Sequence, residues 1–402
     1  MRIWLSRELG AQAMGLVELA QSAQMLLITP VVSGLPAAMS RMCAKADKTQ
    51  HVHVLRSGIL LSLLVSLPLT VLAFFFKTHL ALWLGDIRTL PALICYLPCI
   101  PVLGVSCALN GYYYGISKPV PPALSEILEQ IVRLLLTLRL IHALRGWPAM
   151  LRAAIPAAGT LAGETLSLAL MLILAGRVLF FSHASGGRQA ALRELFALAL
   201  PVTGMKLVSS LMRTVQSVLI PARLQVSGLA ASEALSRLGM LNGMMMPVLM
   251  LPSFVTCSLS MVAAPELTRR QAQGRSQKQL VLRVLSAALI IGLLAMAAVF
   301  FLAPLFAGAL YRQAELEPML RRCCALVPVM ALCQVISALM NGLGLQRISL
   351  RIALFANLLS TMLTFVLASQ PSLRLWGVIM AIAAAQLTTL FASLRALMQA
   401  VD

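Results

Sequence analysis

The sequence Ser106-Cys-Ala-Leu-Asn-Gly111 returns 231 residues later as Ser337-Ala-Leu-Met-Asn-Gly342, and this repetition decides the fold. Each copy ends an apolar segment, and a proline (Pro98 or Pro328) lies upstream of each. A second pair of similar stretches, residues 34–41 and 261–269, leads into basic loops at nearly the same spacing. Two similar halves in the same order predict two helical bundles related by pseudo-symmetry.

The composition places these bundles in a membrane. Of the 402 residues, 60% are apolar and 11% are charged, whereas a soluble chain carries about 25% charged residues. The mean hydropathy is +0.90. The 32 Lys and Arg exceed the 13 Asp and Glu, which gives a net charge of +19. In so apolar a chain, we expect this charge in cytoplasmic loops and against anionic lipid headgroups, with no nucleic acid as a partner.

Several kinds of chemistry lack the residues that they need. The chain has three Asp, none of them inside an apolar segment, which is too few for an enzyme that holds a divalent metal on paired aspartates. Its eight Cys form no CxxC pair and fit small hydrophobic positions. His51 and His53 lie in a basic loop, where solvation is the better interpretation than metal binding. No nucleotide-binding loop or hydrolase motif occurs. We therefore expect a transporter rather than an enzyme, with no cofactor or metal; coupling to protons, sodium or the membrane potential stays open.

The hydropathy predicts an all-α membrane protein with eleven transmembrane helices. An N-terminal lobe of about five helices would cover residues 1–180, and a C-terminal lobe of about six would cover residues 181–402. In the repeat alignment, the span at 195–220 has no counterpart in the first half. Either the first helix is missing, or the first lobe has five helices. The predicted spans are 14–40, 55–76, 90–115, 119–142, 151–176, 195–220, 238–264, 280–306, 320–344, 348–369 and 374–398.

The basic loops predict the orientation. Residues 41–56 and 269–283 together hold nine Lys and Arg against one Asp, and they are six spans apart. An even number of spans places both loops on one side, which the positive-inside rule makes cytoplasmic.

Ionisable residues inside the predicted spans mark the candidate site, because each costs about 2.5–3.5 kcal/mol at the bilayer centre unless a partner or water receives it. Glu126, Glu129 and Arg133 fall on one face of the 119–142 helix, and Glu129 precedes Arg133 in the order that favours an ion pair. This face either locks the helix to its neighbours or lines a cavity that titrates or binds substrate.

A second set of polar residues forms a stripe on the 195–220 helix. It consists of Lys206, Ser209, Arg213 and Gln216. No acid in this span neutralises the two cations, so we expect them to face water, an acid on another helix, or an anionic ligand. Arginine suits phosphate, since its planar fork binds two oxygens. Glu164, in the 151–176 span, would pair with either cation or carry a coupling proton.

These residues resemble a known family. Residues 34–41 are similar to the GLPxAISK-type end of the second helix in the stage V sporulation protein B and polysaccharide-exporter branch of the multidrug/oligosaccharidyl-lipid/polysaccharide (MOP) superfamily. Asn110-Gly-Tyr-Tyr-Tyr-Gly115, Pro119 and Ser125-Glu-x-x-Glu-Gln-x-x-Arg133 resemble that branch's GYxxG, proline and SQxxEQxxR signature. Residues 217–224 resemble the segment after its seventh helix.

The resemblance implies two six-helix lobes around a central cavity, alternating access without ATP, and a bacterial plasma-membrane location. The sequence departs from the pattern at Gln216, where an acid is expected, and at Glu126, where Gln is expected. The resemblance also leads us to expect that the first helix and the two extra C-terminal helices of many relatives are missing.

The leading hypothesis is a monomeric flippase for a lipid-linked saccharide, a peptidoglycan or polysaccharide precursor, in cell-wall synthesis or sporulation. Two alternatives stay open: a cation-coupled multidrug exporter of the same superfamily, and a truncated paralogue that does not transport. The candidate substrate-binding residues are Arg213, Lys206, Gln216, Arg133, Glu129, Glu126 and Glu164.

Overall fold

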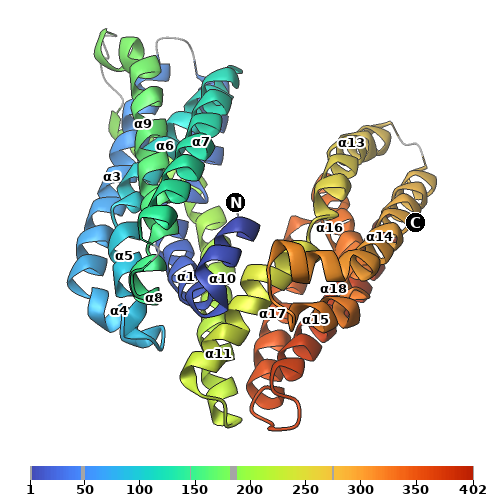
Figure 1. The fold of residues 1–402 in the computed structure, drawn as a ribbon. Coiled ribbons are helices and arrows are strands. Elements are labelled where there is room, and N and C mark those ends of the chain that lie inside the picture. Colours follow the sequence, from blue (N-terminus) through green and yellow to red (C-terminus); the bar gives the residue numbers. More distant parts are fainter. Residues whose placement is uncertain (1, 47–49, 145, 182–187, 274–275, 402) are drawn as a thin grey trace. The chain divides into compact units, whose positions relative to one another are not determined.

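The computed structural model describes residues 2–46, 50–144, 146–181, 188–273 and 276–401 (Figure 1). All regular secondary structure in these ranges is helical. The first half of the chain contains α1 (Arg2–Val32), α2 (Leu35–Lys45), α3 (His51–Phe75), α4 (Lys77–Trp83), the 3₁₀ turn η1 (Ile87–Thr89), α5 (Leu90–Tyr96), α6 (Cys99–Gly115), α7 (Val120–Ala143), α8 (Ala149–Arg152), α9 (Ile155–Phe181) and α10 (Arg188–Val226).

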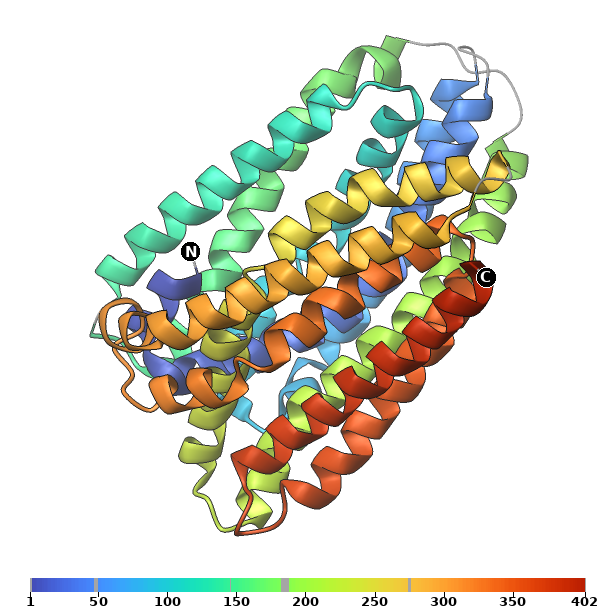
Figure 2. The same cartoon turned by 90° about the vertical axis from the view of Figure 1, so that its right-hand side faces the viewer.

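The second half of the chain continues with further helices. They are α11 (Ala231–Leu238), the π-helical turn η2 (Gly239–Met245), α12 (Met246–Leu249), α13 (Ser253–Ala272), α14 (Lys278–Pro304), the π-helical turn η3 (Leu305–Leu310), α15 (Leu316–Cys323), α16 (Leu326–Gly342), α17 (Gln346–Leu367) and α18 (Leu375–Val401). The last two, α17 and α18, pack along each other (Figure 2).

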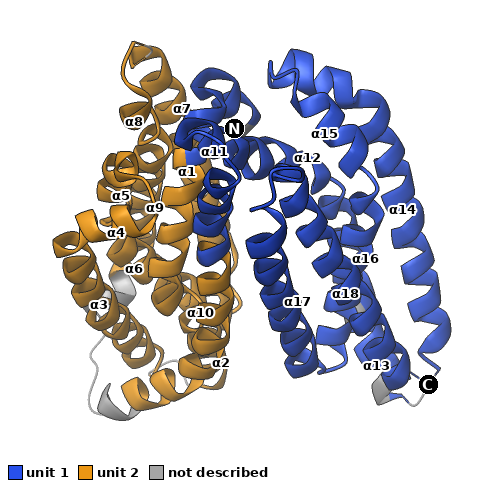
Figure 3. Ribbon diagram, turned by 90° about the horizontal axis from the view of Figure 1, so that it is seen from below, with its two compact units in different colours: residues 1–15, 215–402 blue, residues 16–214 orange. Residues whose placement is uncertain are grey.

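The chain forms two compact units (Figure 3). Unit 2 contains residues 16–214, and unit 1 contains residues 1–15 together with 215–402. Two helices, α1 and α10, therefore contribute residues to both units. The lobes predicted from the sequence repeat are residues 1–180 and 181–402, and this boundary stays a prediction. Residues 182–187, next to the boundary, lie outside the described ranges.

A glycine divides α1 into two helical segments. Gly10 has φ +80° and ψ 167°, which interrupts the helical backbone. Side chains with a Cβ rarely adopt this region, so the bend needs glycine. The bend separates residues 2–9 from the long segment that begins at Ala11, and only that segment enters unit 2.

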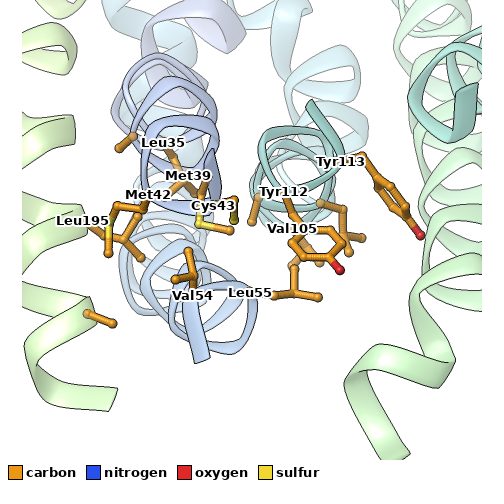
Figure 4. Close-up of a cluster of buried hydrophobic side chains, with 14 of the residues drawn as sticks. Leu35, Met39, Met42, Cys43, Val54, Leu55, Val105, Tyr112, Tyr113 and Leu195 are labelled. Carbon is orange, nitrogen blue, oxygen red and sulfur yellow. The ribbon is translucent and has the colours of Figure 1, made fainter. Parts of the chain in front are cut away.

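Apolar side chains from several helices pack a core in unit 2 (Figure 4). Met39 and Met42 of α2, Leu55 of α3 and Tyr112 of α6 meet there, and Leu195 of α10 closes the cluster. In a membrane, van der Waals packing of these side chains holds α2, α3, α6 and the first half of α10 together. The core thereby positions α10 against the helices of unit 2.

Eight of the eleven predicted spans coincide with single helices of membrane length, and two more coincide with bent helix pairs. Among the described residues, eight helices are long and apolar enough to cross a membrane, or ten if each of two bent helix pairs is one span. The eleventh, α7, is 24 residues long, about 36 Å at the α-helical rise, which exceeds a hydrocarbon core of about 30 Å. It contains four charged residues within its 24 residues. The total of eleven and the missing first helix stay predictions.

Candidate functional site

Arg133 on α7 lies between two carboxylates. Its guanidinium bonds Glu129, one turn earlier on the same helix, and lies 3.6 Å from Oε1 of Glu164 on α9. Both acids are buried, with 9% and 8% of their surface exposed. Glu126 is exposed and lies outside this group. The predicted Glu129–Arg133 pair is therefore present, and Glu164 pairs with Arg133 instead of a cation on α10.

A close approach of α7 and α9 makes this cluster. A Cβ at Gly163 would lie 2.8 Å from the backbone oxygen of Glu129 and 3.4 Å from Cβ of Arg133. Gly159, one turn earlier, approaches Thr137 on α7 in the same way. This Gly-x-x-x-Gly spacing lets two membrane helices pack with their backbones close. Glu164 follows Gly163 directly, so the close packing carries its carboxylate to Arg133.

The charges in the cluster do not balance. Two carboxylates face one guanidinium, and Nε of Arg133 is buried without a hydrogen-bond partner in the described part of the chain. Because an uncompensated charge inside a bilayer is costly, such a group suits the binding of a proton or a cation. The cluster can therefore act as a structural lock between α7 and α9 and also as a site that changes charge.

The polar stripe on α10 has two kinds of member. The Gln216 amide donates to the carbonyl of Asn357 and to Oγ1 of Thr361 on α17, at 3.2 Å each. Lys206 and Arg213, by contrast, are exposed, and neither forms an ion pair within the described ranges. Gln216 therefore joins two helices, while the two cations stay available to a ligand.

Two polar residues in the first span are not among the predicted site residues. Glu18 and Gln21 of α1 are three residues apart, both are half-buried, and the exposed Met25 follows them on the same helix. The signal in the sequence is a carboxylate and an amide one turn apart inside an apolar segment. The high overall hydropathy of that segment conceals it.

Comparison with solved structures shows which proteins share this fold. The chain resembles a multidrug resistance MATE family transporter of the MOP superfamily in an inward-facing conformation, with a TM-score of 0.79, 16% identity, and coverage of 99% of this chain and 92% of the other. It also resembles the lipid II flippase MurJ in an inward closed conformation, with a TM-score of 0.77, 14% identity, and coverage of 98% and 84%. The chain therefore has the same fold as these two proteins.

Sequence comparison then gives the family. Residues 1–271 match the family described as polysaccharide biosynthesis protein, and the chain belongs to that family. It is 27% identical to stage V sporulation protein B of Bacillus subtilis over 95% of this chain and 76% of the relative. It is 22% identical to sporulation protein YkvU of the same organism, over 94% and 85%. The chain is thus a multi-pass bacterial plasma-membrane protein of this family, as its sequence predicts.

Proposed function

We propose that this protein moves a lipid-linked saccharide across the cytoplasmic membrane by alternating access. In this proposal the lipid tail stays in the bilayer, and the phosphate groups of the substrate bind Arg213 and Lys206. The observation that carries the proposal is the pair of exposed cations on one face of a membrane-spanning helix. The family name and the lipid II flippase among the similar folds support the substrate class.

The physical argument rests on the cost of charge in lipid. A cation that faced hydrocarbon near the bilayer centre would cost about 2.5–3.5 kcal/mol on insertion scales, so Arg213 needs water or an anion opposite it. A pyrophosphate supplies oxygens that a guanidinium binds two at a time. Translocation breaks no bond, so the protein needs no catalytic group and no resident cofactor.

Substitution of Arg213 tests the proposal. We expect Arg213→Ala to lose most of the flipping of lipid-linked precursor in cells depleted of their own flippase, at normal expression. Arg193→Ala is the matched control, because Arg193 is exposed on the same helix, near its start. Full rescue by Arg213→Ala, or equal loss in both variants, would contradict the role of Arg213.

For energy coupling, we propose the Glu129–Arg133–Glu164 cluster as the group that takes up a proton or a sodium ion. Its two carboxylates and single guanidinium leave one negative charge to neutralise. The same acids favour a second candidate function, export of organic cations, in line with the MATE transporters among the similar folds.

Glu164→Gln distinguishes the two functions. If the protein exports drugs, its expression gives drug resistance, and Glu164→Gln removes that resistance because the cation then loses its carboxylate. If it flips a lipid-linked saccharide, expression gives no resistance, and Glu164→Gln changes the response of flipping to a proton or sodium gradient. The readouts are growth in drug and flipping in cells with and without the gradient. A flipping response to the gradient that is identical in wild type and variant would contradict the coupling role.

A further inference from the structure

The helices α1 and α10 lie side by side within unit 2 (Figures 1 and 3). Oγ1 of Thr214 donates to the carbonyl of Ser22 at 2.9 Å. Further along, a Cβ at Gly34 would lie 2.3 Å from the carbonyl oxygen of Ala199 on α10. Along the contact, residue numbers increase from Ser22 to Gly34 in one segment and decrease from Thr214 to Ala199 in α10. The two segments are therefore antiparallel.

The geometry of the α-helix places Arg213 to one side of this contact. Successive residues turn by roughly 100°, so Arg213 projects roughly 100° from Thr214. Lys206, seven residues before Arg213, returns to within about 20° of the same direction. Thr214 faces inward, with 1% of its surface exposed, and the two cations are exposed. The cations therefore line one flank of the contact.

The same geometry places Gln21 on the same flank. Two antiparallel helices are related by a twofold axis at right angles to both, so residues that precede the contact by one position on each helix project to the same side. Gln21 precedes Ser22 by one position, as Arg213 precedes Thr214. Glu18 lies between the contact and Gln21 in direction, and Met25, whose side chain is exposed, projects within about 20° of Glu18.

The four side chains follow one another along the membrane axis. At a rise of about 1.5 Å per residue, Gln21 and Arg213 are about 3 Å apart along the axis, and Glu18 lies about 7.5 Å beyond Arg213. Lys206 lies about 10 Å from Arg213 in the opposite direction. Two cations therefore occupy one end of a polar track, and an amide and a carboxylate occupy the other.

We infer that this track orients the substrate, with its phosphates on Lys206 and Arg213 and its first sugar on Gln21 and Glu18. The inference rests on the proposed function and deepens it. Sugar hydroxyls and acetamido N–H groups donate hydrogen bonds, which a carboxylate accepts and an amide oxygen accepts as well. On the predicted topology, α1 runs from the outside to the cytoplasm, so the sugar end of the track lies toward the outside.

Binding of two lipids that differ only in the sugar tests the inference. The probes are undecaprenyl pyrophosphate and undecaprenyl pyrophosphate bearing one N-acetylglucosamine, titrated against the purified full chain in nanodiscs. We expect Gln21→Leu to weaken the sugar-bearing lipid by about fivefold to tenfold, the range of one hydrogen bond, and to leave the bare lipid within twofold. Arg213→Ala should weaken both lipids by the same factor.

Gln24→Leu is the matched control, since Gln24 is buried on a different face of α1. The readout is the ratio of the two affinities, which a general loss of folded protein does not change, and we expect the control to leave it at the wild-type value. An unchanged ratio in Gln21→Leu, or an equal affinity of the wild-type protein for both lipids, would contradict the binding of the first sugar at Gln21 and Glu18. A wild-type protein that binds neither lipid would instead overturn the proposed function, and the inference with it.

Discussion

Arg133 is the counter-charge of two buried carboxylates inside unit 2. It is the cation that bonds Glu129 and lies 3.6 Å from Glu164, and these acids come from two different helices. A buried ion pair adds little net stability, yet removing one partner leaves an uncompensated buried charge. The arginine is therefore expected to matter more for stability than its hydrogen bond to Glu129 suggests.

Arg133→Met should lower the free energy of unfolding by about 3 kcal/mol, because both carboxylates lose their counter-charge. The measurement is unfolding of the purified protein in detergent. Arg139→Met, an exposed arginine on the same helix, is the control and should change stability little. Adding Glu129→Gln and Glu164→Gln to Arg133→Met should restore most of the lost stability. If Arg133→Met alone is as stable as the wild type, the cluster is not a structural lock.

How far the sequence predicts the site depends on the residue. The Glu129–Arg133 pair lies within one helix, where the spacing of four residues fixes the geometry, and the prediction is confirmed. The partner of Glu164 is not predictable, because it depends on which helix packs against α9 and in what register. The spacing along α10 predicts that Gln216 lies with Lys206 and Arg213. In the structure, its amide instead donates hydrogen bonds to residues of α17.

Among the elements, the α7–α9 pair depends on glycine. A side chain at Gly163 would overlap the backbone of α7, whereas a Cβ added at Gly176 on the same helix would meet no atom within 4 Å. The closeness of the two helices, rather than the length of any side chain, brings Glu164 within reach of Arg133.

Gly163→Leu should therefore separate α7 from α9 and destabilise the protein by about 1–3 kcal/mol, as overpacking does in well-packed interiors. Gly176→Leu serves as the control, and we expect it to be nearly neutral. Thermal unfolding in detergent measures the stability, and cross-linking of cysteine pairs placed on α7 and α9 measures the separation. Equal effects of the two substitutions would show that the close approach at Gly163 is not required.

For the whole molecule, the repeat and the basic loops predict a topology. Residues 41–56 and 269–283 should both face the cytoplasm, and the connection between α7 and α8 should face outside. In a chain whose native cysteines are replaced, we expect Gln50→Cys and Gln273→Cys to react with a membrane-impermeant maleimide only after the cytoplasmic side is opened. Gly146→Cys should react in intact cells. Reaction of Gln50→Cys and Gln273→Cys from opposite sides would contradict the pseudo-symmetric arrangement.

The sequence by itself determined the class of this protein: apolar segments of membrane length, a repeat at nearly constant spacing, and a family signature on α6 and α7. These are properties of local composition and periodicity, which a membrane environment converts directly into helices. The tertiary structure alone decided which polar groups meet. It placed Glu164 against Arg133, joined Gln216 to α17, and set Gln21 on the same flank as Arg213, because such contacts depend on helix packing and register rather than on the residues of one helix.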